Sequence, residues 1–166
     1  MEKKHSMSKC ILVAHSQVLH KIFSYEVNKE KTEYYLPLVS TQSLQTLINW
    51  ITTGELSINE ENILNVLESA EFLDIACVSD ICQDWLIGRI SAENALGFWR
   101  YSLEYLLESL QKASFSFMTE HFLDIVKEKE FLELPPKMLL QLLNSDQLIS
   151  EEKFVWKSLI HWSNWS

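Results

Sequence analysis

Hydrophobic positions recur at helical spacing along most of the chain. After Ser40, the apolar residues Leu44, Leu47 and Ile51 fall on one face of a helix, and Gly54 stands just beyond the last of them. Serine is a favourable residue for beginning a helix, and glycine readily adopts the left-handed conformation that ends one. The pattern therefore predicts a helix from Ser40 to Gly54.

Similar stripes predict helices through the rest of the chain. They indicate two short helices over 8–25, a hairpin over 62–73 and 75–90, and helices over 91–107, 110–122, 131–134, 138–143 and 150–162. Pro136 suits the first turn of the 138–143 helix, where a backbone N–H is not needed. Asn59 with Glu60 and Glu61, and likewise Ser91 with Glu93, are interpreted as caps followed by acids in the first turn.

One segment favours a strand. Tyr34-Tyr35-Leu36 is β-prone, follows a polar loop at 27–31 and precedes a proline. The chain holds only three Gly and three Pro, which leaves little room for the tight turns of a many-stranded protein. The predicted fold class is therefore mainly α, with little strand.

The charge of the chain narrows the choice of ligand. A net charge of -9 gives a surface field that repels phosphate backbones and anionic lipid headgroups, so neither nucleic acid nor a membrane is expected as a partner. No apolar run approaches the ~20 residues of a membrane span, and no secretory signal is apparent. The expected compartment is the cytoplasm or the nucleus.

The sequence carries no motif of an active site. Cys10, Cys77 and Cys82 form no C-x-x-C pair, so neither a disulfide framework nor a metal site is indicated, and packing is the preferred interpretation of all three. No triad order, Gly-rich elbow or phosphate loop is present, so no cofactor and no catalysis are expected. Trp162 is interpreted as a core residue by its helical phase, whereas Trp165 is available for contact.

Four segments, taken in order, match a known pattern. They are 12–23, the Ile-Thr-Thr-Gly-Glu-Leu run at 51–56, the hairpin at 62–75, and the stretch 130–148 that contains Glu-Phe-Leu-Glu-Leu-Pro-Pro. Together they resemble the BTB–BACK region of kelch-like proteins, the substrate-adaptor family of cullin-3 ubiquitin ligases. The first three resemble parts of a BTB domain, and the last resembles the BACK signature almost position by position.

The resemblance implies two domains. An N-terminally trimmed BTB (POZ) α/β domain is expected at 1–90, and an all-α BACK domain, C-terminally incomplete, at 91–166. The family's first strands and first helix, which form most of the homodimer contact, have no counterpart before Ser8, so the homodimer stays an open alternative. No kelch repeats follow Ser166, and the substrate is not indicated.

The resemblance also implies a function, that of a protein-interaction adaptor which binds cullin-3 and recruits substrates for ubiquitination. The implied contact consists of a loop and a helix corner: Tyr25, Val27, Asn28, Lys29, Glu30, Phe72, Asp74 and Ile75. The family's hydrophobic-x-Glu motif reads Val27-Asn28-Lys29 here, with Glu30 one place later. A solvated connector is an equally weighted interpretation of the loop. The alternative function is a non-catalytic scaffold or decoy that binds partners without supporting ubiquitin transfer, and an enzyme is a remote third.

Overall fold

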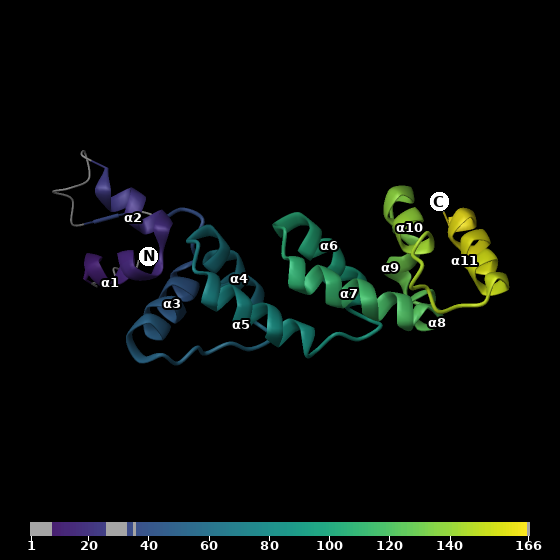
Figure 1. Cartoon of the computed structure of the whole chain (residues 1–166), viewed down its shortest axis with the longest axis horizontal. Helices are drawn as coiled ribbons and strands as arrows, with labels where there is room; N and C mark the ends of the chain where they lie inside the picture. Colours follow the sequence, from purple (N-terminus) through teal and green to yellow (C-terminus); the bar gives the residue numbers. More distant parts are fainter. Residues whose placement is uncertain (1–7, 26–32, 35, 166) are drawn as a thin grey trace. The chain divides into compact units, whose positions relative to one another are not determined.

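The computed structural model describes residues 8–25, 33–34 and 36–165, and these residues are built from helices (Figure 1). The helices are α1 (Lys9–His15), α2 (Gln17–Ser24), α3 (Thr41–Thr53), α4 (Ile63–Phe72), α5 (Ala76–Ile87), α6 (Ala95–Tyr105), α7 (Glu108–Glu120), α8 (Phe122–Ile125), α9 (Lys129–Leu132), α10 (Pro136–Leu143) and α11 (Glu152–Trp165). The chain divides into two compact units, Met1–Gln83 and Asp84–Ser166. The predicted domain boundary near residue 90 stays a prediction.

Helix α3 begins and ends where the sequence predicts. The Ser43 N–H donates a hydrogen bond to the Ser40 hydroxyl oxygen at 3.0 Å. At the other end, Gly54 has a φ of 77° and its N–H donates to the Trp50 carbonyl at 2.8 Å. Helix α10 likewise begins at Pro136, as predicted.

The expected strand is wrong for the residues that the structure describes. Tyr34 and Leu36 lie outside any helix or strand, while Tyr35 falls outside the described residues. A strand needs a backbone neighbour to complete its hydrogen bonds, and none of the described segments forms a strand. Local β-propensity was therefore insufficient here.

An asparagine turn precedes both α4 and α6. The Asn62 side-chain oxygen accepts from the N–H three residues earlier at 2.8 Å, and its amide donates to the carbonyl five residues earlier at 3.1 Å. Asn94 makes the same two bonds at 2.8 and 2.9 Å. Because each helix begins after its asparagine, Glu60, Glu61 and Glu93 lie before the helices, and neither first turn holds an acid. The expected placement of these acids is therefore wrong.

The buried apolar residues of the first unit come from α2, α3, α4, α5 and the connection between the last two. They are Leu19, Leu47, Ile63, Val66, Leu67, Ala70, Leu73, Ile75, Val78 and Cys82. Cys82 is buried, as predicted, one helical turn after Val78. Cys10 and Cys77 are exposed, so packing is the wrong interpretation for them. Cys77 stands on α5 one position before Val78, which turns it away from the buried face.

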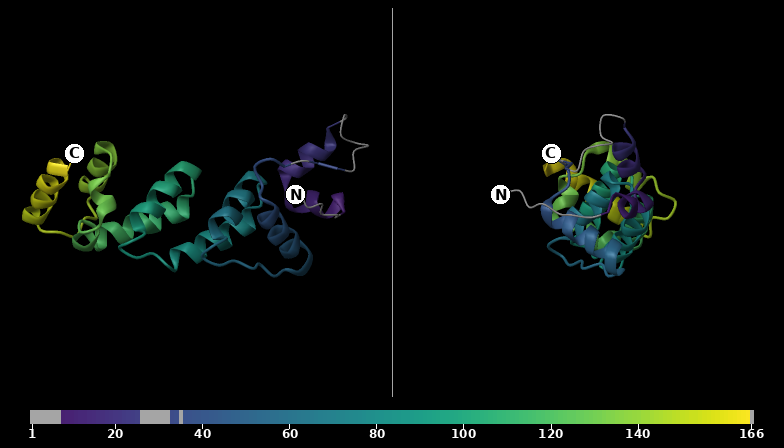
Figure 2. Two further views of the ribbon diagram at one scale, coloured as in Figure 1. Left: turned by 180° about the vertical axis from the view of Figure 1, so that it is seen from behind. Right: turned by 90° about the vertical axis from the view of Figure 1, so that its left-hand side faces the viewer.

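The second unit has a continuous core. Its buried members are Ala95, Leu96, Trp99, Met118, Phe122, Ile125, Phe131, Leu134, Leu139 and Leu142. Helices α6 and α7 lie side by side (Figure 2) and supply four of these ten residues, Ala95, Leu96, Trp99 and Met118. Trp162 packs against the core from α11, and its indole N–H donates to the Leu134 carbonyl at 3.0 Å. The predicted core role of Trp162 is confirmed.

Candidate protein-interaction site

The corner between α4 and α5 is closed by backbone hydrogen bonds. Helix α4 ends at Phe72, and the chain then turns through Asp74, whose φ is 55°. The Ile75 N–H donates to the Ala70 carbonyl at 2.9 Å, and the Asp74 N–H donates to the Glu71 carbonyl at 3.0 Å. These two bonds form a Schellman motif, which satisfies carbonyls that the end of a helix would otherwise leave without partners.

Asp74 occupies the position of this motif that glycine usually fills. A left-handed conformation is uncommon for a residue with a Cβ, although aspartate tolerates it better than most. The two backbone bonds of the motif hold Asp74 in this conformation, and its side chain is exposed. The corner therefore presents a carboxylate from a fixed backbone position.

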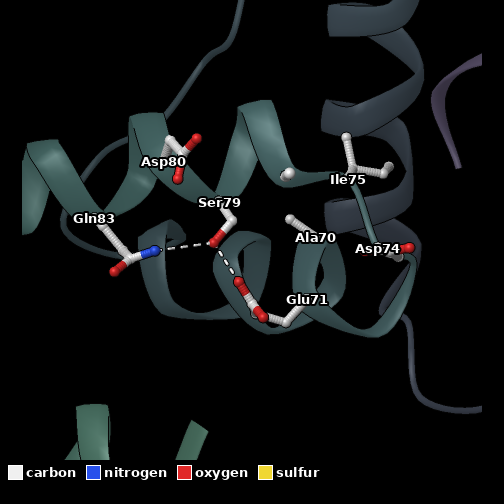
Figure 3. Close-up of a pocket in the computed structure, with 8 residues that line it drawn as sticks. Ala70, Glu71, Asp74, Ile75, Ser79, Asp80 and Gln83 are labelled. Carbon is white, nitrogen blue, oxygen red and sulfur yellow. Dashed lines mark hydrogen bonds between the residues drawn. The ribbon is translucent and has the colours of Figure 1, made fainter. Parts of the chain in front are cut away.

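A shallow hollow lies beside the corner (Figure 3). It has a volume of about 160 Å³ and is lined by Ala70, Glu71, Asp74, Ile75, Ala76, Ser79, Asp80 and Gln83. The Ser79 hydroxyl donates to the Glu71 carboxylate across the two helices, and the Gln83 amide donates to the Ser79 oxygen at 3.2 Å. This network fixes the wall of the hollow. Sequence reasoning missed these three residues, although Ser79 and Gln83 are one helical turn apart.

A buried serine connects the corner to α2. Ser16 is 3% exposed, and its hydroxyl donates to the carbonyl of Leu73 in the corner. The same oxygen accepts the Leu19 N–H at 3.0 Å, which caps the first turn of α2. One side chain therefore begins α2 and holds that beginning against the corner. Helix α2 ends at Ser24 and is followed by Tyr25, whose side chain is 71% exposed.

The structure places the predicted contact residues unequally. Tyr25 and Asp74 are exposed, and Phe72 is half-buried at the last position of α4. Ile75 is only 3% exposed, so its side chain mainly holds the corner together. The four loop residues of the predicted contact, Val27, Asn28, Lys29 and Glu30, lie outside the described residues.

The side chains of Cys82 and Asp124 have shifted pKa values. Burial raises the pKa of the Cys82 thiol to about 12, which disfavours the nucleophilic thiolate. The hydrogen bond from Lys127 lowers the pKa of the Asp124 carboxyl, but this pair lies on an exposed surface. Over the described ranges, no group of three or more His, Cys, Asp or Glu could hold a metal ion. No helix in this part of the chain is long and apolar enough to cross a membrane.

Each half of the chain matches the model of a known protein family. The model described as "BTB/POZ domain" matches residues 1–90, and that described as "BACK: BTB And C-terminal Kelch" matches residues 95–166. The chain is similar to Kelch-like protein 17 of Homo sapiens, with 29% identity over 156 residues, covering 93% of this chain and 24% of that protein. It is also similar to human gigaxonin (28% over 160 residues, 94% and 27%) and human Kelch-like protein 6 (29% over 163 residues, 96% and 26%). The chain thus spans about a quarter of the length of these relatives.

Ser16→Ala should lower the free energy of unfolding by about 2–3 kcal/mol, because it removes both a helix cap and a buried hydrogen bond to Leu73. Ser40→Ala is the matched control, since Ser40 caps α3 in the same way from an exposed position, and its hydroxyl donates to the neighbouring Ser43 hydroxyl and not to a distant segment. The Ser40→Ala substitution should lower the free energy of unfolding by about 1 kcal/mol. Urea unfolding followed by circular dichroism measures both values. Equal losses would show that the Leu73 bond adds nothing.

Asp74→Gly should raise the free energy of unfolding by up to about 1 kcal/mol, because glycine adopts a positive φ without strain. Asp80→Gly is the matched control, since Asp80 is exposed within α5. There the same change should lower the free energy of unfolding by only about 0.3 kcal/mol, because aspartate is already a poor helix former. Thermal unfolding of the two variants beside the parent chain gives opposite shifts. Destabilisation by both would contradict the strained conformation at the corner.

Proposed function

Because this chain belongs to the BTB/POZ family and continues into a BACK domain, we propose that it is a non-catalytic adaptor that binds cullin-3. The coarser role is that of a substrate-adaptor-type interaction protein, in keeping with its kelch-like relatives. The finer role is to bring a substrate close to a ubiquitin ligase, which raises the effective concentration of that substrate.

The hydrogen bond from Ser16 to Leu73 carries this proposal. It joins the beginning of α2 to the α4–α5 corner, so the helix that leads to Tyr25 and the corner that holds Phe72, Asp74 and Ile75 are fixed to each other. The contact proposed on this support consists of Tyr25, Val27, Asn28, Lys29 and Glu30 from the end of α2 and the loop, with Phe72, Asp74 and Ile75 from the corner. A contact surface fixed before binding loses less entropy when a partner docks.

The side chains at the corner indicate which chemical groups of a partner would bind there. Glu71, Asp74 and Asp80 place three carboxyl groups around the hollow, and the half-buried Phe72 follows Glu71 as the last residue of α4. Acidic rims favour partners with basic side chains, and apolar centres supply most of the binding energy. We propose that Val27 and Phe72 provide apolar anchors while Asp74 accepts a hydrogen bond from a basic or polar group.

Val27→Asp should abolish most of the binding, because it places a charge where an apolar side chain is proposed to dock. Isothermal titration of the purified chain with the cullin-3 N-terminal domain should give a Kd of about 10 μM or tighter. The variant should bind at least about tenfold more weakly. Ile149→Asp, at an apolar residue of the second unit that is 66% exposed, is the control and should leave the Kd unchanged. Weak binding by the parent chain, or equal binding by the Val27 variant, would overturn the proposal.

A decoy is the second candidate, and one observation favours it. Lys29 stands where the hydrophobic-x-Glu motif of cullin-3 adaptors has its acid. A lysine cannot accept the charge-assisted hydrogen bonds that a carboxylate accepts. A protein with this change could occupy partners without assembling an active ligase.

Lys29→Glu separates the adaptor from the decoy. If the loop docks as proposed, restoring the acid should tighten binding to the cullin-3 domain about fivefold to tenfold. Lys31→Glu makes the same change in net charge two residues later and should alter the Kd by less than about twofold. Reconstituted ubiquitin transfer to a fused peptide would then be compared between the parent chain and the variant. Transfer by the parent chain itself would exclude the decoy, and equal effects of the two substitutions would show that only general charge attraction had changed.

A further inference from the structure

Helix α11, the last helix of the described chain (Figure 1), has two faces of different character. Its inward face meets the core of the second unit through Val155, Leu159 and Trp162, with the buried Ser158 among them. The opposite face follows helical spacing and is exposed throughout. It consists of Lys153, Trp156, Lys157, Ile160 and Asn164. We call these five residues the outer stripe.

The outer stripe exposes two large apolar side chains one helical turn apart. Trp156 is 61% exposed and Ile160 is 58% exposed. Side chains at positions i and i+4 are neighbours on a helix surface, so these two form one apolar patch. Packing within the second unit does not require them, because α11 meets the core through its opposite face. Exposed tryptophan is also among the residues that most often dominate the binding energy of a protein contact.

The outer stripe also carries two cations and no acid. The Lys153 ammonium lies 3.4 Å from a Glu151 carboxylate oxygen in an exposed ion pair. Lys157 takes part in no ion pair between described residues, and its ammonium lies 6.0 Å from the Phe154 ring centroid. A local group of cations attracts acidic partners, although the net charge of -9 repels them from the chain as a whole.

We propose that the outer stripe is a docking surface for an acidic amphipathic helix of a partner protein. Apolar side chains of that helix pack on Trp156 and Ile160, and its carboxylates lie beside the two lysines. A second copy of this chain is a poor occupant, because a symmetric contact would bring the lysines of one stripe against those of the other. The surface belongs to the second unit and requires no cullin-3, so this inference is independent of the adaptor proposal.

Ordinary exposed surface is the competing interpretation, since single apolar side chains are often exposed in proteins. Trp165 allows the two interpretations to be separated. It is 56% exposed on the same helix, but it follows Trp156 by nine residues, which places it about half a turn around the helix axis. Ordinary surface predicts that the two tryptophans are equivalent, whereas a docking surface predicts that only Trp156 contributes to binding.

The probe is a synthetic, fluorescently labelled peptide with leucines at positions i, i+3, i+4 and i+7 of a helix and glutamates elsewhere. Fluorescence anisotropy at low salt should show that it binds the full chain with a Kd of about 100 μM or tighter. Two control peptides should bind at least about tenfold more weakly. One carries lysine in place of every glutamate, and the other has the same composition with its leucines spread around the helix.

Trp156→Ala should weaken binding of the glutamate peptide about tenfold, and Trp156→Phe about twofold to threefold. Trp165→Ala is the matched control and should leave the Kd unchanged. Circular dichroism checks that each variant is folded, as expected for exposed positions.

Lys157→Gln should weaken binding about threefold, while Lys157→Arg should retain it. Lys137→Gln makes the same change in charge at an exposed residue of α10 and should have almost no effect. Added salt should weaken binding by the parent chain more than binding by the Lys157→Gln variant, because it screens the contribution of the lysine.

Binding by the parent chain weaker than about 1 mM would overturn the proposal. Equal affinity for the lysine peptide would do the same, and so would equal losses in Trp156→Ala and Trp165→Ala. Light scattering of the chain alone tests the second copy as occupant. Self-association that Trp156→Ala abolishes would assign the outer stripe to a homodimer and contradict an acidic partner.

Discussion

The first unit depends on the hydrogen bond that the buried Ser16 hydroxyl donates to the Leu73 carbonyl. That carbonyl belongs to the turn that ends α4, and the hydroxyl belongs to the residue that begins α2. A buried polar group without a partner is costly, so each of these groups requires the other. The corner and α2 are therefore fixed together, and the turn can hold Asp74 at a φ of 55° because its backbone bonds leave it little alternative.

Much of the fold could be predicted because its signals are local. The end of α3 at Gly54 and the start of α10 at Pro136 follow from backbone preferences of single residues. The packing of Trp162 follows from the phase of one helix. In each case the residues that decide the structure lie within a few positions of one another, so hydrophobic spacing and capping chemistry are sufficient.

The features that could not be predicted depend on distant partners. Ser16 and Leu73 are 57 positions apart, and no periodicity links them. Cys77 shows the finer limit, since the apolar stretch around it suggested burial and only the position of neighbouring helices decides which face of α5 is covered. The predicted contact was recovered only in part, because its corner residues Phe72, Asp74 and Ile75 are described while 26–32 are not. The glutamates that helix propensity assigned to the first turns of α4 and α6 lie before these helices, because an asparagine turn precedes each of them.

Three of the polar groups around the hollow are joined by hydrogen bonds. Glu71 already accepts a hydrogen bond from Ser79, and Ser79 accepts one from Gln83, so these groups are engaged with one another. A hydrogen-bonded network of this kind keeps a surface in one shape. Asp74 differs because the backbone presents its carboxylate outward from an exposed position. An exposed carboxylate at Asp74 and a half-buried aromatic residue at Phe72 are the kinds of side chain found in protein–protein contacts, in which an apolar centre provides affinity and the surrounding charges select the partner.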